Sequence, residues 1–126
     1  MIGYVTLGTN DLMKAAAFYD DLLSEIGANR VMEEDRFIAW AVAPDKPALS
    51  VCVPYNGNRA TAGNGTMIAL SVDSTEKVDA LYAKAIQLGG ADEGPPGLRT
   101  DNFYAAYFRD LDGNKLNVFC TKFAGT

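Results

Sequence analysis

The chain has 126 residues, of which 48% are hydrophobic, and its formal net charge is -5. This length suits one domain with a core of ordinary size. Acidic and basic residues are interspersed, so the sequence lacks the basic stripe that a nucleic-acid partner requires. It also lacks a run of about 18 apolar residues to cross a membrane and the residue order of a secretory signal. Two cysteines in separate strand-like runs predict reduced thiols, and we expect a cytoplasmic location.

The first half of the chain predicts a strand, a helix and then three short strands. The segment Ile2–Gly8 is rich in Tyr, Val, Thr and Leu, which mostly favour strands. From Leu12 to Ile26, apolar residues recur every three or four positions, so this stretch predicts an amphipathic helix. Gly27 suits the left-handed position that ends such a helix. The strand candidates that follow, separated by Asp and Pro residues, are Val31–Glu34, Phe37–Ala43 and Ala48–Val53.

The second half repeats this order after a connector. Tyr55–Gly65 is rich in Gly, Asn and small residues and predicts a loop that could also act as a lid. A strand at Thr66–Val72 leads into a helical stripe that ends near Leu88, opened by a capping-box pattern of Asp73 with Glu76. The last predicted strands are Ala91–Leu98, kept short and at the sheet edge by its prolines, and the hairpin of Phe103–Asp110 and Lys115–Thr121.

The two halves are copies of one module. Tyr4–Ala28 is echoed 63 positions later by Met67–Ala91, and a fixed-period self-match indicates repeated structural units. We therefore predict an α+β fold, in which two tandem βαβββ modules form curved mixed sheets around a central cavity. The expected single domain (1–126) comprises a first module (1–54), a connector (55–65) and a second module (66–126). The identical pairs are Leu7/Leu70, Lys14/Lys77, Ala17/Ala80, Tyr19/Tyr82, Gly27/Gly90 and Ala28/Ala91.

Three motifs are distinctive in this order and spacing: YVTLGTNDLMKAAAFYDDLL, MIALSVDS and YFRDLDGNKLNVF. Together they resemble the vicinal oxygen chelate superfamily, which contains glyoxalase I, bleomycin-resistance proteins, fosfomycin-resistance thiol transferases and extradiol dioxygenases. The resemblance covers nearly the whole chain. For the enzymes of that superfamily it implies a divalent metal between the two sheets, held by one side chain from the first and one from the last strand of each module. It also implies a homodimer, because such proteins often pair.

The positions that carry metal ligands in those enzymes hold other residue types here. Where the superfamily commonly has His, Glu or Gln, His and Glu, the matching residues are Tyr4, Cys52, Met67 and Asn117, and Ser50 is an alternative to Cys52 on the same strand face. The chain contains no histidine. Because such metals prefer imidazole nitrogen and carboxylate oxygen, we expect no metal and no other cofactor. Glyoxalase I activity, which needs the metal, is therefore not expected.

Because side chains alternate along a strand, every second residue from these positions lies on the same face of the sheet. We expect this face to form one wall of a binding cavity. Tyr107 joins it by resemblance to a ligand-facing tyrosine of the fosfomycin-resistance proteins, and alternation then adds Arg109. Arg99 follows a Gly-Pro-Pro-Gly stretch that could hold it over the cavity mouth, and Trp40 fits either the core or the wall. The predicted ligand-binding residues are Tyr4, Thr6, Ser50, Cys52, Met67, Tyr107, Arg109, Lys115 and Asn117.

Three functions are compatible with these residues. The first is a metal-independent binding protein of the bleomycin-resistance type, which takes a small molecule, for example an aromatic or anionic one, into the cavity between its modules. The alternative is an enzyme of lyase or transferase type with Cys52 as nucleophile, or with Tyr4 and Tyr107 as acid and base. That alternative requires a cation at Arg109 or Lys115 to lower the pKa of the thiol or phenol. The third is a partner-binding or self-associating surface with a vestigial cavity.

Overall fold

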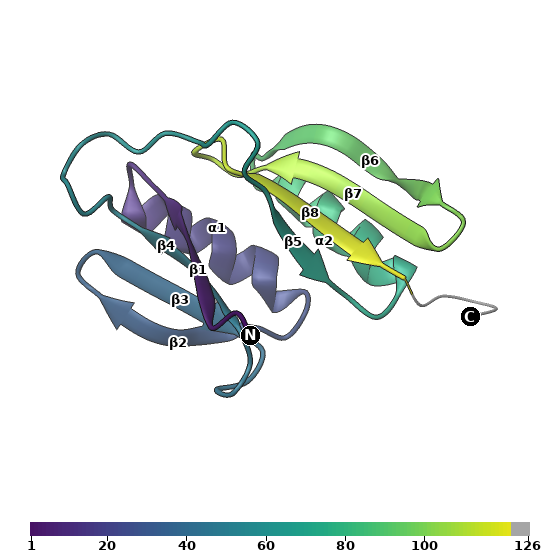
Figure 1. Cartoon of the computed structure of the whole chain (residues 1–126), viewed down its shortest axis with the longest axis horizontal. Coiled ribbons are helices and arrows are strands. Elements are labelled where there is room, and N and C mark those ends of the chain that lie inside the picture. Colours follow the sequence, from purple (N-terminus) through teal and green to yellow (C-terminus); the bar gives the residue numbers. More distant parts are fainter. Residues whose placement is uncertain (122–126) are drawn as a thin grey trace.

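The computed structural model describes residues 1–121 and shows two modules of the same build side by side (Figure 1). Residues 122–126, the end of the predicted second module, lie outside the described residues. The first module consists of β1 (Tyr4–Gly8), α1 (Leu12–Ser24), β2 (Asn29–Glu34), β3 (Phe37–Ala41) and β4 (Ala48–Cys52). The second consists of β5 (Ile68–Ser71), α2 (Thr75–Gln87), β6 (Ala91–Thr100), β7 (Phe103–Arg109) and β8 (Lys115–Cys120). The predicted βαβββ duplication is confirmed.

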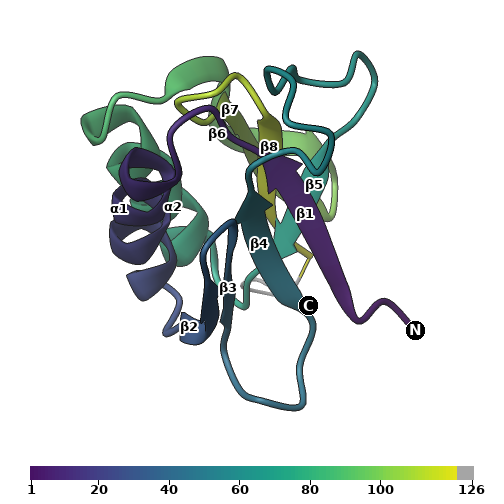
Figure 2. The ribbon, with the colours of Figure 1, turned by 90° about the vertical axis from the view of Figure 1, so that its left-hand side faces the viewer.

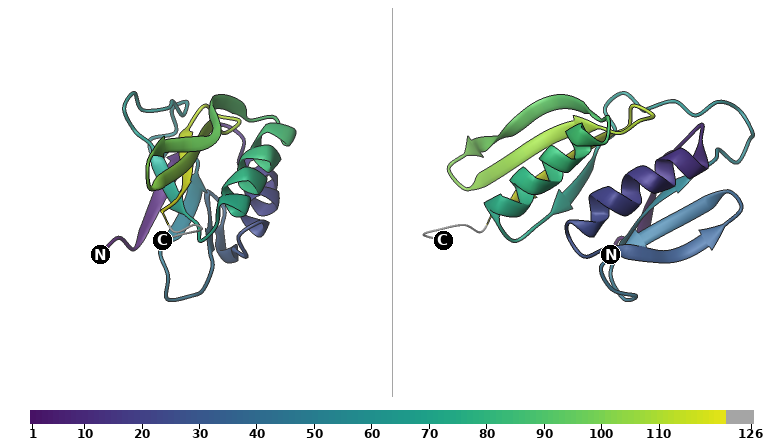
Figure 3. Two further views of the ribbon diagram at one scale, coloured as in Figure 1. Left: turned by 90° about the vertical axis from the view of Figure 1, so that its right-hand side faces the viewer. Right: turned by 180° about the vertical axis from the view of Figure 1, so that it is seen from behind.

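Each module folds its strands into one four-stranded mixed sheet. The strand orders are β1-β4-β3-β2 and β5-β8-β7-β6. β1 runs parallel to β4 and β5 parallel to β8, whereas the other neighbours are antiparallel. β1 and β5 are the edge strands nearest the middle of the molecule (Figure 1). Both helices lie on the same side of the sheets (Figures 2 and 3). We refer to the opposite side of each sheet as its open face.

Both helices begin at a side chain that caps the first turn. The Asp11 carboxylate accepts a 3.1 Å hydrogen bond from the backbone N–H of Lys14. In α2 the cap is Ser74, whose hydroxyl oxygen accepts a 3.2 Å hydrogen bond from the N–H of Lys77. The predicted capping box of Asp73 with Glu76 was therefore wrong: the cap lies one residue later, and the Asp73 carboxylate pairs with the Lys77 ammonium at 2.9 Å. Both caps satisfy N–H groups that a helix start leaves without an internal partner.

Alternate residues of the strands pack against the helices and form the core. In β8, Leu116, Val118 and Cys120 are fully buried. Lys115 and Phe119, which alternate with them, belong to the open face and are only partly buried. Because the side chains of a strand alternate between its two faces, the open face of each sheet carries the residues that the helices do not cover.

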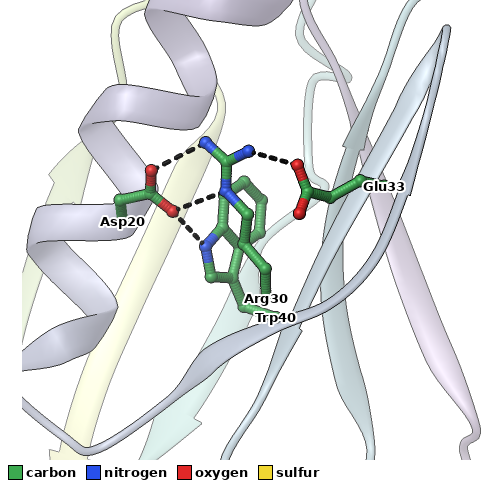
Figure 4. A network of polar contacts seen from close by, with 4 residues as sticks. All are labelled: Asp20, Arg30, Glu33 and Trp40. Carbon is green, nitrogen blue, oxygen red and sulfur yellow. Dashed lines mark hydrogen bonds and ion pairs between the residues drawn. The ribbon is translucent and has the colours of Figure 1, made fainter.

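Trp40 is a core residue, with 1% of its surface exposed. Its indole N–H donates a 2.8 Å hydrogen bond to the Asp20 carboxylate of α1, which also accepts bonds of 2.9 and 2.7 Å from the Arg30 guanidinium (Figure 4). Arg30 lies over the Trp40 ring, 5.9 Å from its centroid, and donates a further 2.8 Å bond to Glu33. This network connects α1 to β2 and β3 and fixes how the helix lies on the first sheet.

The turn between β7 and β8 contacts the end of β1 in the other module. The Asn114 side-chain amide donates a 3.0 Å hydrogen bond to the carbonyl of Gly8, and the Asp112 carboxylate accepts one of 3.0 Å from the N–H of Asn10. Asn10 also holds the connector, because its side-chain amide exchanges hydrogen bonds of 3.1 and 2.8 Å with the backbone of Ala60. These contacts set the position of the connector, which crosses from the first module to the second (Figure 1).

The last edge strand is longer than its prolines suggested. β6 spans ten residues, Ala91–Thr100, whereas the sequence predicted a short strand ending at Leu98. It lies at the edge of its sheet, as predicted, and its pairing with β7 shifts register around Pro95 and Pro96, where backbone N–H donors are missing. None of the helices between residues 1 and 121 is long and apolar enough to cross a membrane.

Candidate functional site

The open face of the first sheet carries four predicted site residues, Tyr4, Thr6, Ser50 and Cys52. Thr6 and Ser50 are register partners in the parallel strands β1 and β4. Tyr4 is 63% exposed, whereas Ser50 is fully buried and its hydroxyl donates a 2.6 Å hydrogen bond to the carbonyl of Val5. Ser50 is therefore engaged with the sheet backbone, and Tyr4 is the prominent side chain of this face.

A cavity of about 710 Å³ lies over this face. The rings of Tyr4 and Phe37 meet edge to face there, with centroids 6.2 Å apart. The lining mixes these aromatic rings with small residues and with both signs of charge, including Glu34, Arg36 and Lys46. Of the nine predicted ligand-binding residues, Tyr4 alone lines this cavity within the part of the chain that the structure describes.

The open face of the second sheet gathers cations around Tyr107. Tyr107 in β7 is the register partner of Asn117 in β8, and Arg109 is the partner of Lys115. The Lys115 ammonium lies 5.6 Å from the centroid of the Tyr107 ring, and the Arg99 guanidinium lies 5.4 Å from it. A cation at this distance over an aromatic face is attracted by the ring quadrupole. Arg99, which the sequence predicted over the cavity mouth, thus lies on the ring of a predicted ligand-binding residue.

A cavity of about 530 Å³ lies where the connector meets the end of this face, and we call it the connector cavity. It brings together three predicted residues, Met67, Arg109 and Lys115. Sequence reasoning treated the connector as a loop or lid and missed its individual residues, for which the Gly- and Asn-rich composition was the available signal. The lining contains two cations and no acid, and consists of Ala62, Gly63, Asn64, Gly65, Thr66, Met67, Arg109 and Lys115.

A larger space of about 840 Å³, the inter-module cavity, lies between the first module and β5. Its lining is mostly apolar, with Val5 and Leu49 from the first module and Ile68 and Leu70 from the second. Met67 lines both this cavity and the connector cavity, so the two spaces have one lining residue in common. Apolar concave spaces with a few polar groups at one end are typical of small-molecule sites.

Comparison with known proteins agrees with this architecture. A family model described as the glyoxalase/bleomycin resistance protein/dioxygenase superfamily matches residues 1–118. The chain belongs to this superfamily. The predicted resemblance is therefore confirmed over nearly the whole sequence.

Several solved structures share the fold. A glyoxalase/bleomycin resistance protein from Albidiferax ferrireducens T118 is 36% identical with a TM-score of 0.88, over 95% of this chain and 98% of that chain. A hypothetical protein from S. aureus is 26% identical with a TM-score of 0.74, over 95% of this chain and 92% of that chain. A lactoylglutathione lyase from Agrobacterium tumefaciens is 22% identical with a TM-score of 0.69, over 94% and 92%, which shows likeness of fold alone. A comparison with curated proteins gave no match.

The divalent metal of the superfamily's enzymes does not fit the residues at the four matching positions. Tyr4 and Cys52 lie on the first sheet, and Met67 and Asn117 belong to the second module. Asn117 is 1% exposed and its amide nitrogen donates a 3.0 Å hydrogen bond to the carbonyl of Ala106, so this side chain is engaged with the backbone. Between residues 1 and 121, no three His, Cys, Asp or Glu side chains are grouped to hold a metal ion. Phenol, thiol, thioether and amide are a poor donor set for such a metal.

Cys52, the proposed nucleophile of the alternative enzyme, is half-buried at the end of β4. Arg109 and Lys115, the cations invoked to activate it, line the connector cavity, and Cys52 does not belong to that lining. Across the described residues, no hydrogen bond joins the thiol to either cation. The structure therefore associates Lys115 with Tyr107, and Arg109 with Gly113 and Glu93, rather than with the thiol.

Two tyrosines of the second module have raised pKa values and lie away from the open faces. The Tyr104 hydroxyl donates a 2.6 Å hydrogen bond to Asp79 of α2, and this bond is the main cause that raises the pKa of Tyr104 to about 12. The Tyr82 hydroxyl donates a 2.9 Å bond to Asp92, and burial followed by this bond raises the pKa of Tyr82. Both phenols serve helix and strand packing, so they are not candidates for the site.

Proposed function

We propose that this protein is a metal-independent member of the superfamily that binds a small molecule in the space between its modules, where the inter-module and connector cavities adjoin. One observation carries the proposal: the superfamily's four ligand positions hold Tyr4, Cys52, Met67 and Asn117, while cavities of about 840 and 530 Å³ are both lined by one of them, Met67. A fold that keeps its concave spaces without a metal-binding donor set is suited to binding rather than to metal-assisted chemistry.

The lining supports an organic ligand with an apolar body. Val5, Leu49 and Ile68 present apolar surface in the inter-module cavity. Met67 stands where this apolar space meets the cationic lining of the connector cavity. Methionine is unbranched and adaptable, so its side chain can adjust to the shape of a bound molecule.

Thermal-shift measurements test the proposal, because a molecule that binds only the folded state raises the melting temperature. We expect at least one organic compound of a metabolite library to raise the melting temperature, and divalent zinc, nickel, manganese and iron to leave it unchanged. Tight stoichiometric binding of any of these metals at the Tyr4, Cys52, Met67 and Asn117 positions would contradict the metal-independent function.

A matched pair of variants connects the effect to the inter-module cavity. Ala69 lines that cavity, and Ala69→Phe narrows it. Ala17 is exposed on α1, and Ala17→Phe makes the same chemical change away from the cavity. We expect the first variant to reduce the ligand-induced shift and the second to preserve it. Equal shifts in both variants would place the ligand elsewhere.

We also propose, on the superfamily resemblance, that the protein works as a cytoplasmic homodimer. Light scattering after size-exclusion chromatography measures the mass in solution directly. A dimer has twice the 13.5 kDa mass of the chain. A mass of one chain at micromolar concentration would contradict the dimer.

A further inference from the structure

We propose that the cations around Tyr107 form a subsite for the anionic group of an organic ligand. The subsite consists of Lys115 and Arg109 in the connector cavity and of Arg99 on the Tyr107 ring. This inference rests on the proposed function and specifies its ligand class: a small molecule with an apolar body and a carboxylate or phosphate group. The apolar body extends past Met67 into the inter-module cavity.

Lys115 is the principal cation of this subsite. It lines the connector cavity and lies over the Tyr107 ring. Within the described residues it forms no ion pair, whereas Lys77 and Lys84 each pair with a carboxylate. A partly buried ammonium without a carboxylate partner is available to pair with an anionic ligand.

Arg99 is held in place by its own strand. Its guanidinium donates hydrogen bonds of 2.9 Å to the carbonyl of Gly97 and 2.7 Å to the carbonyl of Pro95. Gly94 leaves room for it, since a Cβ at this position would make tight contacts of 3.2 Å with both Arg99 Nη2 and Tyr107 Cδ2. The Gly-Pro-Pro-Gly stretch thus fixes a guanidinium on the Tyr107 ring with no acid as its partner among residues 1–121.

Arg109 adds a second cation to the connector cavity. One of its nitrogens donates a 2.8 Å hydrogen bond to the carbonyl of Gly113, and another lies 3.4 Å from the Glu93 carboxylate. Glu93 is the one acid paired with the three cations in the described chain, so their combined charge stays positive. Such a patch contrasts with the net charge of -5 of the whole chain and attracts anions locally.

The size of the cavity favours an organic anion over an inorganic one. A volume of about 530 Å³ falls in the range of drug-sized ligand sites, far above the space that a single phosphate ion occupies. The adjoining apolar lining at Met67 suits the remainder of the same molecule. The cationic and apolar parts together therefore recognise both ends of one ligand.

Amide chemical shifts of the isotope-labelled full chain test the subsite. The probes are phenyl phosphate, benzoate, the neutral benzyl alcohol, and inorganic phosphate. We expect phenyl phosphate or benzoate to shift the amides of Thr66, Met67 and Lys115, and added sodium chloride to weaken the binding. Benzyl alcohol and inorganic phosphate are expected to bind at least about tenfold more weakly, because each lacks one of the two recognised parts.

Two charge-removing variants complete the test. Lys115→Met keeps the apolar stem of the side chain and removes the ammonium. We expect this variant to bind the anionic probe at least about tenfold more weakly. Lys14→Met removes the same charge from the exposed side of α1 and is expected to keep the affinity of the unmodified chain. The salt dependence tests the charge contribution even if Lys115→Met folds poorly.

Several results would overturn the inference. They are anion affinity that does not respond to salt or to Lys115→Met, shifts confined to other amides, no shift from any probe, and inorganic phosphate binding as tightly as phenyl phosphate. Benzyl alcohol binding as well as both aromatic anions would overturn the anion subsite while leaving the proposed small-molecule function in place. The metabolite screen addresses that broader function independently.

Discussion

The hydroxyl of Tyr19 donates a 2.6 Å hydrogen bond to the carboxylate of Asp110, across 91 positions of the sequence. Tyr19 lies in α1 of the first module, and Asp110 follows β7 of the second. Both are buried, with 0% and 6% of their surfaces exposed. Burial, and then the Asp110 charge, raises the pKa of Tyr19 well above its ordinary value. The bond therefore links the two modules beside the turn that contacts β1.

Removing this hydroxyl with Tyr19→Phe should destabilise the protein. The change leaves the ring in the core but takes a donor away from a buried carboxylate, which costs roughly 1 to 3 kcal/mol. Asn114 still donates a 3.0 Å bond to Asp110, so we expect the fold to persist. The measurement is the free energy of unfolding by urea.

The matched control is Tyr82→Phe, at the equivalent position of the second copy. Tyr82 is partly buried, and its hydrogen bond to Asp92 is exposed to solvent. We expect the free energy of unfolding to change by less than about 0.5 kcal/mol, as is usual at the surface. Equal changes in the free energy of unfolding for the two substitutions would show that the bond between the modules stabilises the protein no more than the surface bond does.

The Asp20 network predicts a loss of stability in acid. The hydrogen bond from Arg30 lowers the pKa of Asp20 below its usual range, with a smaller contribution from Trp40. Because the folded state favours the ionised carboxylate, its contribution is complete above about pH 4 and is lost as the pH falls through the lower folded value. Urea unfolding at a series of pH values, followed by the fluorescence of the single Trp40, measures this loss.

Asp20→Asn should reduce the slope of stability against pH below about pH 4, since the side chain no longer titrates. The amide oxygen can still accept the bond from Trp40, so the substitution tests the charge more than the packing. Asp21→Asn is the control, because Asp21 is exposed on the same helix. An unchanged acid slope in Asp20→Asn would rule out the Arg30 pairing as its cause.

Most of the fold could be predicted from local patterns. The internal repeat predicted the two modules. Apolar spacing predicted α1, which ends at Ser24 rather than at the expected Ile26, and Gly27 has the expected left-handed φ of +76°. The length of β6 could not be predicted, because pairing with β7 overrides the local effect of Pro95 and Pro96. The α2 cap was missed since Asp73 and Ser74 are both good caps by residue type.

The site was harder to predict than the fold. Strand alternation correctly separated Lys115 from its buried neighbours, but it could not tell which open-face residues border a cavity. Ser50 and Asn117 lie on the open face as alternation predicted, but their side chains donate hydrogen bonds to backbone carbonyls and are not free to contact a ligand. The partners of the cations were also invisible, because Arg99 and Tyr107 meet only through the pairing of β6 with β7.

The phenol of Tyr104 should titrate unusually late. Its hydrogen bond to Asp79 raises its pKa to about 12, so the folded state favours the neutral phenol. The stability from this bond is complete below about pH 10 and is lost as the pH rises through the folded value. Residue-specific NMR of the tyrosine rings during alkaline titration measures the shift.

Asp79→Asn removes the main cause and should bring the pKa of Tyr104 down toward its ordinary value near 10. Asp45→Asn is a suitable control, because Asp45 is exposed in the first module. A pKa of Tyr104 that does not move in Asp79→Asn would refute the assigned cause. Lowering in both variants would indicate a general charge effect instead.

Thiol labelling tests the enzyme alternative. Cys52 is half-buried and Cys120 is fully buried, so a disulfide-exchange reagent should label one thiol in the native protein and the second only after unfolding. Since no hydrogen bond joins Cys52 to Arg109 or Lys115 in the described residues, we expect its rate at neutral pH to be no faster than that of glutathione. Cys52→Ser should abolish the native-state labelling, whereas Cys120→Ser should preserve it. Labelling of Cys52 much faster than glutathione, slowed by Lys115→Met, would instead support a thiolate nucleophile activated by that cation.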